Sequence, residues 1–181
     1  MTGDLARLLN ALGLVLVSAV LALALADELW FGDLPCPLCV LQRAAFVAAG
    51  FGLALNLVFG PKPSHYAVTI LGAAAGAAIA MRQIVLHIVP GTGSYGDPIL
   101  GLHLYTWSFM IFALIIIGSA VMLLDDRQFA RAEPISTRLK SLPLLALTLF
   151  TVLTLAVMAS TIALCGAGLC PDSPERYLLF Q

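Results

Sequence analysis

The sequence predicts an all-α integral membrane protein, a helical bundle with about five transmembrane segments, and three observations lead to this fold class. Hydrophobic residues occupy 61% of the 181 positions and charged residues only 10%, whereas about 25% of residues are charged in a soluble domain. The mean hydropathy is +1.01. The apolar residues also form five runs, each close to the roughly 20 residues that a helix needs to cross a bilayer. The chain shows none of the alternating ten-residue patterns of a membrane β-barrel.

The five runs follow one another along the chain with short connections. They are Leu8–Ala26, Cys39–Phe59, Tyr66–Val89, Leu104–Leu124 and Leu142–Leu164. The first run lacks the basic flank and the small-residue cleavage site of a signal peptide, so we expect it to be a retained helix. Without repeats or low-complexity linkers, residues 1–181 are predicted to form a single transmembrane domain.

The charges predict the orientation of this domain. Six basic residues fall on the side of the N-terminus and of the second and fourth connections: Arg7, Lys62, Arg127, Arg131, Arg138 and Lys140. The opposite side holds Arg176 in the tail and Arg43 at the start of the second run, while Arg82 lies inside the third run. The positive-inside rule therefore places the N-terminus in the cytoplasm and the C-terminus outside. The nine Lys and Arg residues form no basic stripe, so we expect no nucleic-acid partner.

Two smaller features concern the helices and the bilayer. Gly72 and Gly76 have the spacing that allows close packing of membrane helices, although incidental spacing in an Ala-rich run is the alternative. Trp30, Tyr105 and Trp107 are expected to anchor the protein at the membrane interface.

All four cysteines fall on the predicted outer side. Cys36 and Cys39 lie at the entry to the second run, and Cys165 and Cys170 lie just past the fifth. Thiols that served only as small hydrophobic residues would be scattered through the apolar runs. Two pairs in an oxidising compartment instead predict two potential disulfides.

The segment "LPCPLCVLQR" combines two thiols with a cation at the start of a helix. Unpaired amide groups at a helix N-terminus stabilise a thiolate, and Arg43 lies one turn beyond Cys39 on the same face. Such an arginine can favour the thiolate and also donate hydrogen bonds to an anionic or carbonyl oxygen. A structural disulfide with Arg43 at the lipid headgroups is one alternative. Half of a metal site is another, but zinc requires four converging ligands and the second pair has no histidine nearby.

Three segments resemble the DsbB family of bacterial inner-membrane disulfide bond formation proteins. They are "PCPLCVLQR", "MRQIVLHIVP" at Met81–Pro90 and "GLHLYTWSFMIF" at Gly101–Phe112. The resemblance covers about half of the chain and implies a four-helix-bundle core in the bacterial inner membrane. It also implies a thiol oxidase that hands electrons to a membrane quinone, either ubiquinone or menaquinone.

The resemblance assigns roles to individual residues. It implies that Cys39 faces the quinone as a thiolate, that Cys36 exchanges with the second cysteine pair, and that Arg43 contacts the quinone. Arg82 and His87, toward the outer half of the third run, are the further candidates for quinone binding. His87 can hydrogen-bond a quinone carbonyl or carry protons, and the alternative is a purely structural bond between helices.

The second cysteine pair departs from the family pattern. The family carries it in the loop between the third and fourth helices, but "PGTGSYGDPILGLHLY" contains no cysteine. We therefore expect residues 165–181 to form a periplasmic C-terminal tail in which Cys165 and Cys170 replace that loop. The tail pair would accept electrons from a DsbA-like thioredoxin-fold partner. The alternatives are a structural tail disulfide with a different partner, and a non-enzymatic, disulfide-stapled membrane scaffold or small transporter.

Overall fold

The computed structural model describes residues 3–89, 91, 98–129, 141–166, 168–171 and 176–180. Five helices in these ranges are long and apolar enough to span a membrane. They are α1 (Gly3–Ala26), α2 (Pro37–Phe59), α3 (Pro63–Leu86), α4 (Leu104–Leu123) and α5 (Ser141–Cys165). The predicted all-α class and the five predicted runs are therefore confirmed, with bounds that shift by a few residues. Three of the basic residues used for orientation, Arg131, Arg138 and Lys140, lie outside the described residues.

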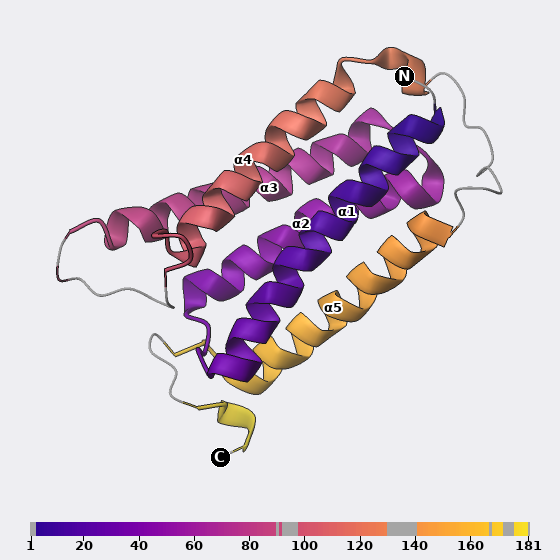
Figure 1. Cartoon of the computed structure of the whole chain (residues 1–181). Coiled ribbons are helices and arrows are strands. Elements are labelled where there is room, and N and C mark those ends of the chain that lie inside the picture. The colour runs from indigo at the N-terminus through magenta and orange to yellow at the C-terminus, as the bar shows by residue number, and fades with distance from the viewer. Residues whose placement is uncertain are drawn as a thin grey trace.

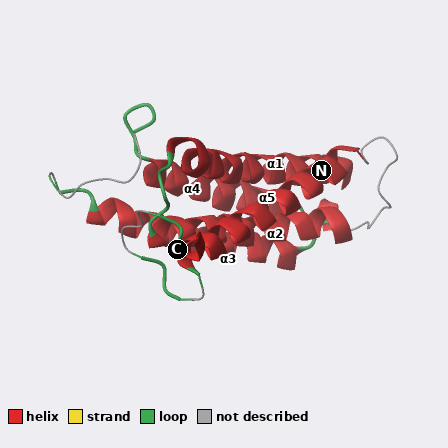
Figure 2. Cartoon of the chain, turned by 90° about the horizontal axis from the view of Figure 1, so that it is seen from below, coloured by secondary structure: helices red, strands yellow, loops and turns green. Residues whose placement is uncertain are grey.

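The helices pack side by side along one bundle axis (Figure 1). α3 packs between α2 and α4, and α1 packs between α2 and α5, so α5 lies at one side of the bundle. We call the end that holds the start of α2 and the end of α5 the thiol end. The N-terminus of α1 lies at the opposite end. Figure 2 shows that most of the described loop segments gather at the thiol end, away from the N-terminus.

Small residues let α3 lie close to both of its neighbours. A Cβ atom on Gly72 would lie 2.7 Å from the backbone nitrogen of Ala49 in α2. A Cβ atom on Gly76 would overlap the ring of Phe112 in α4. Phe112 in turn stacks on Phe46 of α2, with ring centroids 3.9 Å apart. The predicted close packing at the Gly72–Gly76 pair is confirmed. It holds α3 against α2, the helix whose first turn carries Cys39.

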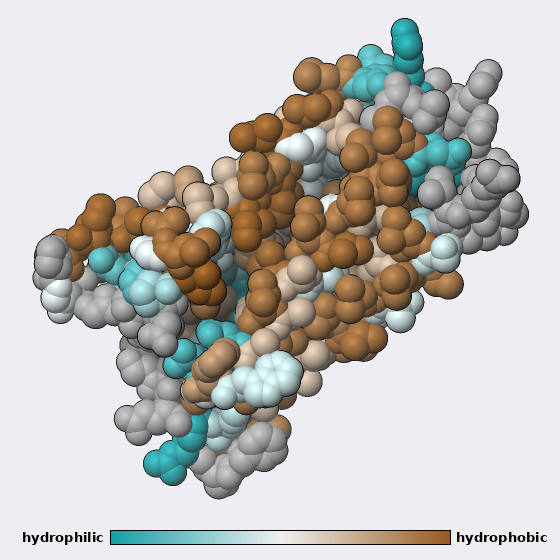
Figure 3. Space-filling model, viewed as in Figure 1, coloured by the Kyte–Doolittle hydropathy of each residue, from teal (hydrophilic) through white to brown (hydrophobic). Residues whose placement is uncertain are grey.

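The flanks of the bundle are apolar, as a bilayer requires. Leu16, Leu23 and Leu71 are each about two-thirds exposed, at 66%, 68% and 71%. Figure 3 shows apolar residues along the bundle, with hydrophilic residues toward its ends. Because side chains in contact with lipid need no burial inside the protein, this surface supports a multi-pass membrane protein.

A buried polar network fastens the end of the bundle opposite the thiols. Asn10 of α1 donates to the hydroxyl of Tyr66 in α3 (2.8 Å) and accepts from Asn56 of α2 (2.9 Å). Tyr66 donates to Gln128, just after α4 (3.0 Å). These bonds connect four segments, so the helices are held in a fixed arrangement at the end far from the cysteines.

Candidate functional site

The cysteine pair lies at the first turn of α2. Cys36 is the N-cap residue, and its sulfur accepts a hydrogen bond from the backbone N–H of Cys39 (3.2 Å). Pro37 begins the helix, where its missing N–H leaves no bond unmade. The helix therefore begins two positions before Cys39, the expected first residue. Both cysteines are free thiols, and Cys36 is buried at 3% exposure.

A glutamine from α3 contacts both sulfurs. The side-chain amide of Gln83 donates to the sulfurs of Cys36 and Cys39, at 3.5 Å from each. Gln42 of α2 donates to the carbonyl oxygen of the same side chain (2.6 Å). Because that oxygen already accepts from Gln42, the amide NH2 of Gln83 is turned toward the thiols. Gln83 is fully buried.

The sequence analysis did not identify Gln83 or Gln42. Both occur in the quoted segments, Gln42 beside Arg43 and Gln83 beside Arg82. A polar side chain in a membrane helix that is otherwise apolar is a functional signal by itself. That signal could have found Gln83, but only the packing of α3 on α2 shows that it reaches the sulfurs.

Arg43 is buried and paired rather than extended to the headgroups. It is 7% exposed, and its guanidinium forms an ion pair with Glu28 and donates to the backbone oxygen of Ala24 (2.7 Å). Glu28 lies in the π-helical turn Asp27–Phe31 that continues α1. The alternative in which Arg43 reaches the lipid headgroups is therefore wrong. Glu28 was not predicted from the sequence, because the acidic pair Asp27–Glu28 at the end of an apolar run is usual for a helix that leaves the membrane.

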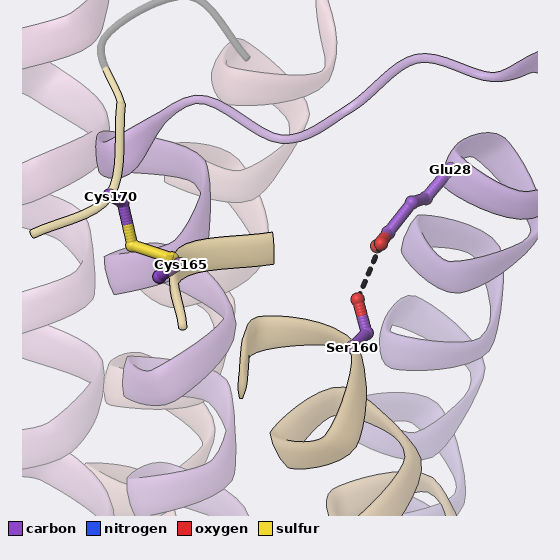
Figure 4. Close-up of a disulfide and its surroundings, with 4 residues drawn as sticks. All are labelled: Glu28, Ser160, Cys165 and Cys170. Carbon is purple, nitrogen blue, oxygen red and sulfur yellow. Dashed lines mark hydrogen bonds between the residues drawn. A yellow bond between two sulfur atoms is a disulfide. The ribbon is translucent and has the colours of Figure 1, made fainter. Parts of the chain in front are cut away.

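Glu28 joins four parts of the chain. Its side chain is completely buried. Its carboxylate forms an ion pair with Arg43 of α2 and accepts a hydrogen bond from the hydroxyl of Ser160 in α5. The hydroxyl of Tyr177, in the tail, donates to the same carboxylate (2.8 Å). Figure 4 shows Glu28 and Ser160 facing each other across the gap between their helices.

A cavity of about 360 Å³ opens beside these groups. Its polar lining comes from Cys39, Gln42, Arg43 and Gln83 together with Asp27, Asp33, Tyr105 and Ser108, and apolar side chains such as Phe46 line the rest. Ligand pockets usually measure about 300–1,000 Å³ and combine apolar walls with a few polar groups, as this cavity does. Its shape and lining suit a flat, mostly apolar molecule that presents oxygen atoms.

Tyr105 corrects one expectation from the sequence. It was expected to anchor the membrane interface, but it is only 7% exposed and lines the cavity. Its ring stacks between two histidines, with centroids 5.5 Å from His87 and 5.3 Å from His103. Its position at the start of α4, which packs on α3, turns it inward. Trp30, in contrast, is 82% exposed at the thiol end.

The remaining candidates from α3 lie outside the cavity wall. His87 caps the end of α3, and its Nδ1 lies 2.8 Å from the backbone oxygen of Gln83, so this nitrogen carries the proton. His87 stacks on Tyr105, which lines the cavity. Arg82 is exposed and is not among the residues that line the cavity.

The tail cysteines form a disulfide. Cys165 is the last residue of α5 and is 6% exposed, and its sulfur is bonded to that of Cys170. Figure 4 shows this disulfide at the end of α5, the helix that also carries Ser160. The predicted pairing of these two cysteines is confirmed. The structure thus holds one disulfide and one dithiol, both at the thiol end of the bundle.

At the thiol end, two groups outside the spans have shifted pKa values. A hydrogen bond to Cys39 and burial together raise the pKa of the Cys36 thiol above its usual range. Cys36 therefore keeps its proton at neutral pH when the pair is reduced. Burial and the neighbouring carboxylate of Glu28 raise the pKa of Tyr177 to about 12, so its hydroxyl remains a hydrogen-bond donor at all ordinary pH values.

Comparisons with known proteins match the part of the chain that holds the cysteine pair of α2. The family profile described as "Disulfide bond formation protein DsbB" matches residues 6–95. A "Disulfide bond formation protein B" of Xanthomonas euvesicatoria pv. vesicatoria is 30% identical over 115 residues, which are 60% of this chain and 67% of the relative. The protein of the same name from Marinobacter nauticus is 30% identical over 154 residues, which are 65% of this chain and 92% of the relative.

A third relative is more similar over a shorter stretch. The "Disulfide bond formation protein B" of Stutzerimonas stutzeri is 39% identical over 75 residues, which are 39% of this chain and 46% of the relative. No solved structure gives a significant match. The profile match includes Cys36, Cys39, Arg43 and Gln83, and it ends before α4, α5 and the tail disulfide.

Proposed function

The chain belongs to the DsbB family of disulfide bond formation proteins, and we propose that it is a quinone-dependent thiol oxidase. In this proposal, electrons pass from a periplasmic thioredoxin-fold dithiol partner, DsbA-like in kind, through the two cysteine pairs to ubiquinone or menaquinone. The observation that carries the proposal is the position of Cys39. This reactive sulfur lines an apolar cavity within a membrane-spanning bundle, beside the buried cation Arg43.

The residues around the cavity fit a quinone ring. The aromatic ring of Phe46 and the side chains of α1 offer apolar contact, and the amide of Gln42 and the guanidinium of Arg43 offer donors for ring oxygens. A bound quinone supplies an acceptor for two electrons and two protons, which are what a dithiol releases when it becomes a disulfide. Since Arg43 is already paired with Glu28, its charge is balanced before any ligand enters. Arg82 and His87 are not among the described residues that line the cavity, and His87 stacks on Tyr105, which does line it.

The two cysteine pairs exchange electrons in steps that balance. A partner dithiol reduces the Cys165–Cys170 disulfide and leaves with a disulfide of its own. A tail thiolate, which we assign to Cys170, then attacks Cys36 in the Cys36–Cys39 disulfide and expels Cys39 as a thiolate. Cys165 next attacks Cys170, which restores the tail disulfide and releases Cys36. Two electrons have then moved to the pair of α2, where the amide of Gln83 donates to both sulfurs.

The proposed location follows from the family and from the charges. We place the protein in the bacterial inner membrane, with the thiol end and the C-terminus in the periplasm and the N-terminus in the cytoplasm. Among the described residues, Arg7, Lys62 and Arg127 lie toward the end opposite the thiols, which supports this orientation.

Quinone reduction by the purified protein tests the proposal. The protein in detergent or nanodiscs is mixed with a soluble quinone analogue and a reduced DsbA-like thioredoxin-fold protein, and quinone absorbance is followed. We expect turnover with the parent protein and none with Cys39→Ser, because a hydroxyl is too weak an acid to replace the thiolate. Equal rates for the parent and for Cys39→Ser would refute the proposal.

A second candidate function keeps the quinone and changes the role of the tail. Cys165 is buried at the end of α5, and the tail lies beyond the family-profile match, as a purely structural disulfide would allow. In that case a different dithiol would reduce Cys36–Cys39 directly. Deletion of the chain after Leu164 distinguishes the two, because only the relay through the tail requires the deleted cysteines.

A non-enzymatic scaffold is the other alternative. In that case the α2 cysteines would keep the same redox state whatever the state of the quinone pool. Thiol trapping during quinone depletion measures that redox state.

A further inference from the structure

The segment that carries the tail cysteines is bound to one buried carboxylate on both sides. Ser160 precedes Cys165 in the sequence, Tyr177 follows Cys170, and both hydroxyls donate to the same oxygen of Glu28. The other oxygen of Glu28 is paired with Arg43, the arginine of the C-x-x-C-x3-R segment. A single side chain therefore connects the tail disulfide to the helix that carries Cys36 and Cys39.

The burial of Glu28 makes these contacts necessary. Its side chain has no exposed surface, and an ionised carboxylate without solvent must be fully paired to be tolerated. Arg43 alone satisfies one oxygen, and the two hydroxyls satisfy the other. Ser160 is fixed within α5, whereas Tyr177 belongs to the tail, so the tail supplies one of the partners that the carboxylate requires.

From this arrangement, we propose that Glu28 is a positioning residue that docks the tail cysteine pair against Cys36, and that the hydroxyl of Tyr177 is its tether. The inference rests on the proposed relay between the two pairs and adds the device that brings them together. A segment held at both sides explores less space, so the effective concentration of a tail thiol at Cys36 rises. Neither Glu28 nor Tyr177 takes part in the exchange itself.

The effective concentration can be measured without quinone or partner. In a Cys39→Ser, Cys165→Ser background, only Cys36 and Cys170 remain. Oxidised glutathione converts these two thiols into a Cys36–Cys170 disulfide and is reduced to two molecules of glutathione, so the reaction balances. The fraction of protein in this disulfide, measured by mass spectrometry over a series of glutathione redox buffers, gives the effective concentration of one thiol at the other.

Tyr177→Phe is the central variant, because it removes one hydroxyl from a partly exposed tail residue and leaves the helices unchanged. Because the lost hydrogen bond is one to a charged, buried carboxylate, we expect the effective concentration to fall about tenfold or more. The matched control is Thr151→Val, which removes a hydroxyl of α5 that bonds only within its own helix, to the backbone oxygen of Leu147 (2.8 Å). The control should equal the background protein.

Glu28→Gln provides the second arm. The glutamine oxygen that faces the tail is neutral, so the hydrogen bonds from Ser160 and Tyr177 are weakened, and its NH2 faces the guanidinium of Arg43, so the ion pair is lost. We expect the effective concentration to fall as in Tyr177→Phe, and the quinone KM to rise in the otherwise wild-type protein. Tyr177→Phe should leave the quinone KM with a small dithiol as reductant unchanged. General destabilisation would not raise the quinone KM in Glu28→Gln and leave it unchanged in Tyr177→Phe.

Three results would overturn the inference: a Tyr177→Phe effective concentration within twofold of the background, an equal fall in Thr151→Val, or no Cys36–Cys170 disulfide in the background protein. Failure of the proposed function is a separate result, since it appears as absence of quinone reduction by a small dithiol in the wild-type protein. Because the pKa of Tyr177 is about 12, the ratio between Tyr177→Phe and background should be the same at pH 7 and pH 8.5. The titration of the thiols affects both proteins alike.

Discussion

Replacement of Gln83 by methionine tests how the protein stabilises a thiolate in an apolar site. Gln83→Met keeps a similar side-chain volume and removes the only amide that contacts both sulfurs among the described residues. At 3.5 Å and shared between two sulfurs, these bonds fall at the weak end of hydrogen bonds to charged groups, about 1.5 kcal/mol. Since about 1.4 kcal/mol corresponds to a factor of ten, we expect the thiolate population of the pair to fall about tenfold.

The assay is the rate of alkylation at neutral pH of the fully reduced protein. The thiolate is the reactive form, so the rate at Cys39 with iodoacetamide, followed by mass spectrometry of the labelled peptides, reports its population. The thiols of Cys165 and Cys170 in the same molecule are the internal control, and their rates should not change. A rate at Cys39 within twofold of the parent would refute the role of Gln83.

A second variant separates this effect from loss of stability. Gln83→Met leaves the buried amide of Gln42 without its acceptor, which costs about 1–3 kcal/mol. The double variant Gln42→Met, Gln83→Met removes both partners and avoids that cost. If the amide acts on the sulfurs, the double variant should recover thermal stability but not the alkylation rate. Recovery of both would mean that Gln83 matters only for packing.

Three further predictions concern quinone turnover. Arg43→Lys should raise the quinone KM several-fold with little change in melting temperature. Lysine lacks the planar guanidinium that can donate to Glu28, Ala24 and a ligand oxygen together. An unchanged KM in a folded variant would contradict this. Cys36→Ser should abolish turnover with a dithiol partner while Cys39 can still be alkylated, and wild-type turnover would remove Cys36 from the relay. Truncation after Leu164 should stop oxidation of the thioredoxin-fold partner but preserve quinone reduction by small dithiols; partner oxidation at the normal rate would leave the tail a structural element.

The sequence by itself determined the membrane class, the five spans and the pairing of Cys165 with Cys170. These follow from properties that lie close together along the chain. A run of about 20 apolar residues can only satisfy its backbone in lipid as a helix, and Cys165 and Cys170 are near neighbours. The start of α2 is also determined by neighbouring residues. Pro37 and the N-cap Cys36 place it within two residues of the expected position.

Only the tertiary structure decided which side chains meet at the site. Gln83 is far from the C-x-x-C segment in sequence, and Glu28 precedes Cys36 by only eight residues, but neither has a spacing that points to the site. Gln83 reaches the sulfurs because Gly72 and Gly76 bring α3 close to its neighbours. Glu28 meets Arg43, Ser160 and Tyr177 because α1 packs between α2 and α5. Tyr105 is turned inward because α4 packs on α3. Contacts between helices depend on their relative rotation and depth, which the pattern along one helix does not fix.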